Sequence, residues 1–256
     1  MSTGLPQPIE QIEYPDSDGE PMSDNTLQWD WMVKIVSELR VMYTGQNVFV
    51  AGDLLWYPVQ GSPKTRLAPD GMVAFGRPPG YRGSYKQWEE AGIAPQVIFE
   101  VLSPRNTYDE MIDKKDWYSR YGAEEFYIID PYEHHVEGYR RDGDQLMPIA
   151  RMNGHVSPRL GIKFMTTHEG LIILTPEGRE FQSREEHVDE LNEELARIDA
   201  EREAAEVKLE AAQRDAQEAV RQVEAERFAK ERLSAKLREM GIDPEAVLRA
   251  NTSGES

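Results

Sequence analysis

VIFEVL, residues 97–102, is the stretch of sequence that decides the fold. It is apolar at every position but one and stops at Ser103-Pro104, which is typical of a β-strand buried on both faces of a sheet. The exception is Glu100. An ionised carboxylate in apolar surroundings has to be paired, hydrogen-bonded or bound to a metal, or else it takes up a proton. The stretch therefore predicts a central strand that carries a candidate functional residue.

Helical and strand-like patterns alternate on both sides of this strand. Apolar residues at helical spacing follow the capping residues Asp24 and Asn25, and short apolar runs bounded by Pro, Gly or Asp-Pro indicate strands. The predicted elements are a helix from about 24 to 45, strands at 48–57 and 72–75 joined by a hairpin connection at 58–66, the strand at 97–102, a helix at 109–121, a strand at 126–129, and a hairpin of 136–139 with 146–150. This order predicts an α/β fold in which a mixed central sheet is flanked by helices.

A polar stretch, residues 76–94, lies before the central strand and is too long for a tight turn. It combines cationic and aromatic side chains, which together could contact phosphates and bases. The alternative is a cover over the sheet whose charges are solvated. The side chains concerned are Arg77, Arg82, Lys86, Tyr81, Tyr85 and Trp88.

The C-terminal third has the composition of a long helix, in which Glu, Ala, Arg, Lys and Leu predominate. An apolar seam with alternating steps of three and four residues predicts an α-helical coiled coil over 183–240. Only Arg202, Glu226 and Lys230 interrupt this seam. Because an exposed apolar stripe is unfavourable, we expect a partner helix, most simply that of a second copy of the chain. A single solvated helix with many charge pairs is the alternative.

The domain organisation follows from these patterns. The chain is predicted to comprise an irregular N-terminal lead at 1–23, a compact α/β domain at 24–175, a linker at 176–182, the coiled coil at 183–240, and a helix stop with a disordered tail at 241–256.

Composition excludes several classes of site. The chain has no cysteine, so disulfides, zinc–thiolate sites and thiol nucleophiles are ruled out. Its 47 acidic and 29 basic residues give a formal net charge of -18, which disfavours a strong non-specific hold on nucleic acid unless the basic groups gather at the site. The first residues lack the basic start and apolar run of a signal peptide, and no stretch approaches the roughly 18 apolar residues of a membrane span. We therefore expect a soluble, cytoplasmic protein.

Three charged positions suggest a hydrolytic site. Asp70 enters one predicted strand, Glu100 interrupts the next, and Lys114 or Lys115 lies on the following helix. Two carboxylates on neighbouring strands can jointly hold a hard cation, which prefers oxygen ligands. Such a cation polarises a phosphate and lowers the pKa of its bound water, and a nearby lysine stabilises developing negative charge. Each residue also has a simpler explanation, as a turn residue, a buried ion-pair partner or a solvated helix charge.

Several longer segments occur in a recognisable order. They are YPDSDGEPM at 14–22, VAGDLLWY at 50–57, APDGMVAFG at 68–76, GSYKQWEEAGIAPQVIFEVLSP at 83–104 and KKDWYSRYGAEEFYIIDP at 114–131. Together they resemble the Uma-two family of candidate restriction endonucleases, which is placed in the PD-(D/E)XK nuclease superfamily. The resemblance covers about residues 14–165, and a coil ending in a phrase such as REMGIDPE is common in the family. It implies a restriction-endonuclease-like core that hydrolyses phosphodiester bonds with Mg²⁺ or Mn²⁺.

The resemblance also implies which residues act. Asp70 matches the aspartate of the superfamily's PD element and Glu100 matches its second acid, both as catalytic metal ligands. The superfamily's lysine ordinarily stands two residues after that acid, where this chain has Leu102. The lysine therefore moves to the next helix in this family, with Lys114 as the best match and Lys115 as the runner-up.

Two further residues enter through the same resemblance. Ser103 could hydrogen-bond into the site, and Glu38 is a first-helix acid that could add a metal ligand. The leading hypothesis is thus an Mg²⁺-dependent endonuclease that acts on DNA and is a homo-oligomer through 183–240. A catalytically inactive nuclease-like fold that serves as a binding or scaffold protein is the alternative, favoured by the absent strand lysine and the strong acidity. A nuclease that acts on RNA or on a modified nucleic acid is a third hypothesis.

Overall fold

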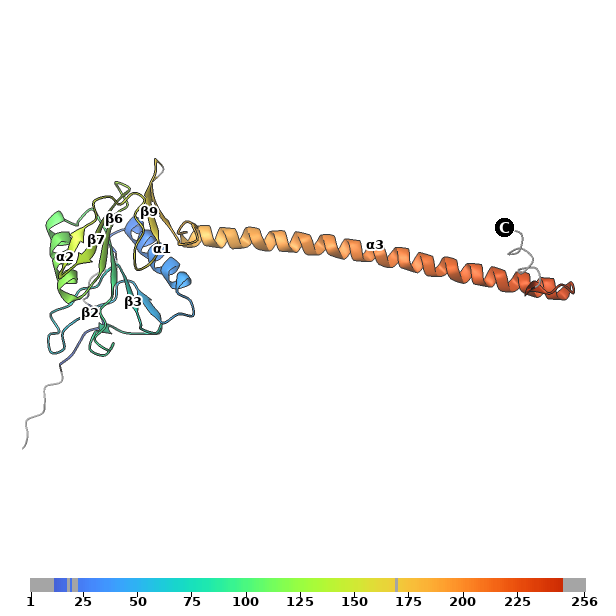
Figure 1. Ribbon diagram of the computed structural model, residues 1–256, viewed down its shortest axis with the longest axis horizontal. Coiled ribbons are helices and arrows are strands. Elements are labelled where there is room, and N and C mark those ends of the chain that lie inside the picture. Colours follow the sequence, from blue (N-terminus) through green and yellow to red (C-terminus); the bar gives the residue numbers. More distant parts are fainter. Residues whose placement is uncertain (1–11, 18, 20–22, 169, 246–256) are drawn as a thin grey trace, which may run out of the picture. The chain divides into compact units, whose positions relative to one another are not determined.

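The computed structural model describes residues 12–17, 19, 23–168 and 170–245 (Figure 1). The chain divides into two compact units, with the division between Val188 and Asp189. Most of the predicted N-terminal lead, and the tail after Glu245, lie outside the described residues.

The first unit is built on a six-stranded sheet with the order β1-β3-β5-β6-β7-β8. Its strands are β1 (Val48–Ala51), β3 (Gly71–Phe75), β5 (Val97–Val101), β6 (Glu125–Asp130), β7 (His135–Asp142) and β8 (Gln145–Pro148). The neighbours β5 and β6 run parallel, and the other neighbouring pairs are antiparallel. The predicted mixed α/β fold, with VIFEVL as a central strand, is therefore confirmed.

Two helices are capped by the residues that their sequence supplies. The side chain of Asn25 accepts a hydrogen bond from Gln28 N–H at the start of α1 (Thr26–Met42). A capping box of Thr107 and Glu110 opens α2 (Tyr108–Tyr121), and Gly122, with φ 109°, ends it in the left-handed conformation. This second helix is the crossover that a parallel pair of strands requires.

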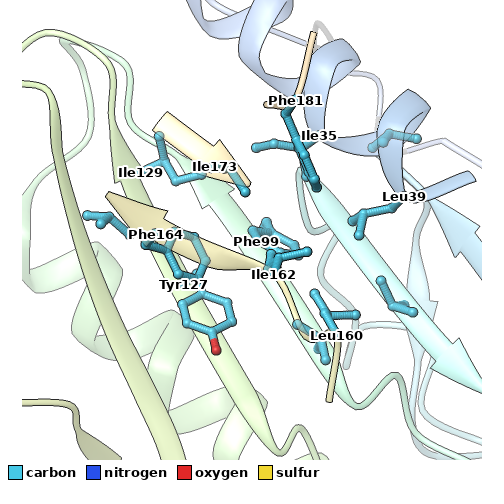
Figure 2. Close-up of a cluster of buried hydrophobic side chains, with 14 of the residues drawn as sticks. Ile35, Leu39, Phe99, Tyr127, Ile129, Leu160, Ile162, Phe164, Ile173 and Phe181 are labelled. Atoms are coloured by element: carbon cyan, nitrogen blue, oxygen red, sulfur yellow. The ribbon is translucent and has the colours of Figure 1, made fainter. Parts of the chain in front are cut away.

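The sheet has a separate apolar layer on each face, and α1 and α2 lie to either side of β6 in Figure 1. Ile35 and Leu39 of α1 pack with Phe99 on one face, as Figure 2 shows. Met111 and Tyr118 of α2 pack on the other face. Because side chains alternate along a strand, β5 sends Phe99 to the α1 side and Glu100 to the α2 side.

The predicted strand at 48–57 is wrong in one respect, because the chain turns in its middle. Strand β1 ends at Ala51, and Asp53 has a left-handed backbone with φ 48°. A Cβ at Gly52 would lie 2.9 Å from Val36 Cγ2 and from the carbonyl oxygen of Asp70, so a glycine lets α1 and β3 approach closely here. Of the predicted strand 48–57, only the part that forms β1 therefore pairs with β3.

The rest of the predicted strand forms β2 (Trp56–Tyr57), which pairs in parallel with β4 (Tyr85–Lys86). The predicted hairpin connection at 58–66 thus leads away from the main sheet, closed by an isolated bridge between Trp56 and Leu67. Strand β4 comes from the polar stretch 76–94, and its Tyr85 is fully buried in the apolar layer on the α2 face, which agrees with a covering role for this stretch.

A small sheet of β9 (Lys163–Thr166) and β10 (Leu171–Leu174) had no counterpart among the predicted strands. It packs on the α1 face through Phe164 and Ile173. The compact unit continues beyond the predicted boundary at residue 175, because Phe181 is fully buried in the same layer (Figure 2).

The second unit consists mainly of the helix α3 (Arg184–Glu239), which spans 56 residues. None of its residues is buried, and most of its large apolar side chains are about half exposed or more. Ile242 N–H donates to the carbonyl of Leu237, and Gly241 has φ 74°, so the helix ends at the predicted stop. In the part of the chain that the structure describes, no helix is both long and apolar enough to cross a membrane.

Candidate functional site

The register of the central sheet brings the two predicted acids together. Gly71 of β3 pairs with Phe99 of β5, so the antiparallel register, continued by one residue, places Asp70 opposite Glu100. Asp70 Oδ2 accepts a hydrogen bond of 2.7 Å from the N–H of Val101. Both carboxylates belong to the face of the sheet that α2 covers.

Helix α2 adds a lysine and a tyrosine to this pair. Lys114 Nζ lies 2.7 Å from Glu100 Oε2, and the Tyr118 hydroxyl donates to Glu100 Oε1 at 2.5 Å. The two side chains are four residues apart and therefore share one face of the helix. Glu100 is only 2% exposed, so its charge is balanced inside the protein. We call Asp70, Glu100, Lys114 and Tyr118 the acid–lysine cluster.

The neighbouring lysine points elsewhere. Lys115 Nζ lies 3.1 Å from Asp116 Oδ1 and 5.8 Å from the ring centre of Tyr139. Of the two lysines that the sequence offered, the structure brings Lys114 to the acids.

The electrostatics of the cluster are dominated by burial. Burial, and then the charge on Glu100, raise the pKa of Asp70 well above its ordinary value of 3.8. Burial by itself lowers the pKa of Lys114, but the charge and hydrogen bond of Glu100 outweigh it, so that pKa is raised. Burial and the charge on Glu100 raise the pKa of Tyr118 well above its ordinary value. Tyr118 therefore remains a hydrogen-bond donor to Glu100.

This shift in the pKa of Asp70 has a consequence for stability. Because the pKa of Asp70 is higher in the folded than in the unfolded protein, the protonated side chain contributes to the free energy of unfolding. This contribution is fully present below pH 3.8, and it is lost as the pH rises through the pKa of the folded protein. We expect Asp70→Asn, which cannot ionise, to raise the melting temperature near pH 7 in the presence of a chelator. The gain should shrink as pH falls toward 3.8. Thermal unfolding followed by circular dichroism measures it, and an equal melting temperature of wild type and variant near pH 7 would contradict the expectation.

A third acid, Asp53, belongs to the same region and was not singled out from the sequence. The register of Ala51 with Met72, continued by two residues, brings Asp53 to the level of Asp70, and its charge helps to raise the pKa of Asp70. Its strained backbone is of a kind that clusters at functional sites. The available signal was an aspartate directly after the buried run VFVAG, at the same end of its strand as Asp70.

The acid–lysine cluster opens onto a polar cleft of about 720 Å³. Asp53, Asp70 and Lys114 line one part of it, and Lys64 and Arg66 from the loop after β2 line another. Asp24 and Glu110 also line the cleft, so it combines four acids with the cations Lys64, Arg66 and Lys114. A lining of this mixed kind offers both carboxylates for a cation and positive charges for a phosphate.

Two candidates from the sequence have other partners. The Ser103 hydroxyl donates to Asp24 Oδ2 at 2.6 Å, at the edge of the cleft. Glu38 accepts hydrogen bonds from Arg179 and from Gln182 N–H, which ties α1 to the segment before α3. Glu38 lines neither of the two cavities that contain Asp70. The structure therefore does not bring Glu38 to the acid–lysine cluster.

The cations of the polar stretch are also engaged. Arg77 Nε and Arg82 Nε lie 2.7 Å and 2.6 Å from the two oxygens of Glu90, which is 8% exposed. The guanidinium of Arg82 also lies 3.9 Å from the ring centre of Phe49. The ion pairs therefore brace the stretch 76–94 internally, and Arg82 also fixes it to the sheet through Phe49, which favours the covering role over nucleic-acid contact.

The donor set fits a cation of the magnesium class. Among the described residues, no three acidic or histidine side chains come close enough together to form a complete metal cage. Mg²⁺ does not need one, because it is usually held by one or two carboxylates together with water and substrate phosphates. Asp70 lines the polar cleft, and the buried Glu100 lies opposite it on the neighbouring strand. A positive charge at Asp70 would offset the burial that raises its pKa.

These features define an α/β protein whose mixed sheet brings two acids and a helix lysine together beside a polar cleft. Residues 5–163 match the model of the Uma2 family, described as "Putative restriction endonuclease". The chain belongs to the Uma2 family.

Comparisons with individual proteins add little to this. A comparison with curated protein sequences found no match. One similar solved structure is the crystal structure of "a putative nuclease belonging to DUF820 from Anabaena variabilis ATCC 29413", with 16% sequence identity and a TM-score of 0.40. The similarity covers 52% of this chain and 72% of that chain.

Proposed function

We propose that the chain is a metal-dependent endonuclease that hydrolyses phosphodiester bonds in DNA at the acid–lysine cluster. The observation that carries the proposal is the pairing of Asp70 with Glu100 across β3 and β5, with Lys114 hydrogen-bonded to Glu100. The description of the family as a restriction endonuclease supports this reaction class, and restriction endonucleases act on DNA.

Each residue of the cluster has a distinct task. Asp70 and Glu100 would hold Mg²⁺ or Mn²⁺, which supplies polarisation of the phosphate and a bound water of lowered pKa. Tyr118 donates to Glu100 Oε1 and fixes the carboxylate plane. Lys114 stays protonated because its pKa is raised, and it stabilises the negative charge that develops on the phosphate.

The surroundings suit a polyanion despite the net charge of -18. Lys64 and Arg66 line the cleft and can neutralise phosphates on either side of the bond that breaks. Many of the acidic residues lie on α3, in the other unit. Binding should therefore weaken as salt rises, because each phosphate that a lysine or arginine neutralises releases counterions.

Cleavage of a covalently closed plasmid tests the proposal, because a circular substrate has no ends and reports endonuclease activity alone. We expect the full-length chain to nick or linearise it with Mg²⁺ or Mn²⁺, and a chelator to stop the reaction. Structured RNA is the matched second substrate. Cleavage of RNA but not of DNA would contradict the DNA assignment, and cleavage of neither, with metal binding shown by calorimetry, would contradict nuclease activity.

The helix lysine gives a sharper test within the same assay. We expect Lys114→Ala to slow cleavage at least about tenfold, or about 1.4 kcal/mol of barrier, because it removes the positive charge beside Glu100. Metal affinity should change little. Lys115→Ala is the matched control, since Lys115 contacts Asp116 and Tyr139 instead. Single-turnover rates with both variants measure the difference, and a larger loss in Lys115→Ala would rule out our assignment of the lysine.

One observation favours a second candidate function, a binding or scaffold protein without catalysis. Both oxygens of Glu100 already have partners, Lys114 and Tyr118. A buried carboxylate satisfied in this way can be a purely structural ion pair. Calorimetry separates the two: Mn²⁺ binding that is lost in Glu100→Gln supports the nuclease, and no Mn²⁺ binding by the wild type supports the scaffold.

We also propose that α3 joins copies of the chain into a homo-oligomer. Val188, Leu191, Leu195 and Ile198 fall on the predicted seam and are each about half exposed. A helix with a repeating apolar stripe buries that stripe when it pairs with a second helix of the same kind. Ion pairs such as Arg202 with Glu206 support the helix itself and do not cover the stripe.

A further inference from the structure

A second cavity adjoins the polar cleft and is chemically different from it. It has a volume of about 400 Å³ and runs along one face of α1, where Trp29, Met32, Val33 and Val36 line it at helical spacing. Ser37 and Arg40 of the same helix also line it, and Gly52, Asp53 and Asp70 complete the lining. We call it the α1 groove.

The α1 groove and the polar cleft meet at the acids. Asp53 and Asp70 line both cavities, so a ligand whose phosphate lies at Asp70 has an apolar space on one side and cationic side chains on the other. Lys64 and Arg66 lie only on the cleft side. The two cavities together therefore have the amphipathic character of a nucleotide, with a charged phosphate and an apolar ring.

We propose that the α1 groove binds one unpaired nucleobase of the strand that is cleaved, next to the phosphate held at Asp70. Trp29 is 40% exposed and lines the groove, so its indole is available to stack on a base. The volume lies within the usual range of small-ligand pockets, roughly 300–1,000 Å³. This inference rests on the proposed nuclease function.

The groove also defines the substrate class. A base inside a duplex is stacked and paired, so it reaches a pocket only from a single strand or after it is turned out of the helix. A single-stranded or locally unpaired nucleic acid is therefore the preferred substrate. Stacking on an aromatic ring tolerates any base, so the preference concerns strandedness more than sequence.

Binding of labelled oligonucleotides to the full-length chain tests the inference without any need for turnover. The probes are a short single-stranded oligothymidylate, an abasic strand with the same number of phosphates, and the corresponding duplex, measured by fluorescence anisotropy with Ca²⁺ in place of Mg²⁺. We expect the oligothymidylate to bind about tenfold more tightly than either of the other probes. Trp29→Ala should remove this advantage and leave binding of the abasic strand unchanged.

Leu27→Ala is the matched control, since Leu27 lies on the same helix, is 38% exposed and lines neither cavity. It should bind all probes as the wild type does. Equal binding of the intact and abasic strands by the wild type, together with metal-dependent plasmid cleavage, would overturn the base pocket and leave the nuclease standing. Binding of no probe and cleavage of no substrate would overturn both.

Discussion

Asp70→Asn should reduce cleavage by at least about a thousandfold, or about 4 kcal/mol of barrier, while the protein folds at least as well as the wild type. The amide has nearly the shape of the carboxylate, so its oxygen can still accept from Val101 N–H, as Asp70 Oδ2 does. It carries no charge and is a weaker ligand for a hard cation. Metal binding measured by calorimetry should fall together with the rate.

Asp70→Asn is informative because it should lower the cleavage rate and raise the melting temperature. A loss of activity that came from unfolding would lower the melting temperature, whereas the raised pKa of Asp70 leads us to expect a higher one near pH 7. Asp113→Asn, which removes an exposed acid beside Lys114, is the control and should change neither quantity. Cleavage by Asp70→Asn within about threefold of the wild-type rate would remove Asp70 from the site.

The second large effect concerns the mass of the assembly. We expect light scattering on the full-length chain, at tens of micromolar, to give at least twice the mass of one chain. The triple variant Leu191→Asp, Leu195→Asp, Ile198→Asp should return it to the mass of one chain, because three charges on the seam would be desolvated in any helix pair.

A matched triple variant distinguishes an effect of charges on the seam from an effect of added charges elsewhere on α3. Val207→Asp, Val220→Asp and Phe228→Asp also add three charges to exposed apolar positions of α3, but these positions lie off the predicted seam. The control should keep the mass of the wild type. A wild type with the mass of one chain at these concentrations would contradict self-association through α3.

The sequence predicted those site residues that differ in polarity from their immediate neighbours in the chain. Glu100 stood out because every neighbour in VIFEVL is apolar, and the structure places it at the centre of the cluster. Tyr118 was not singled out from the sequence, although its spacing of four residues places it on the same helix face as Lys114. The choice of Lys114 over Lys115 depended on the family resemblance, because adjacent lysines on a helix have no local feature that distinguishes them.

What the sequence did not reveal depends on pairing between distant segments. The two-residue strand β2 pairs with β4 across a long loop, and short strands of this kind carry no periodic pattern. The small sheet of β9 and β10 is short as well. Asp53 gains its place from the register of β1 with β3, which a linear pattern of residues does not specify.

The spacing of ion pairs along the chain bears on the order of folding. Lys114 is 14 residues from Glu100, whereas Arg179 is 141 residues from Glu38. Closing a short loop costs less chain entropy than closing a long one. We therefore expect the ion pair of Lys114 with Glu100 to form early in folding, and the ion pair of Arg179 with Glu38 to form last. Pulse-labelled hydrogen exchange during refolding should protect the amides of β5 and β6 before those of the segment around Arg179.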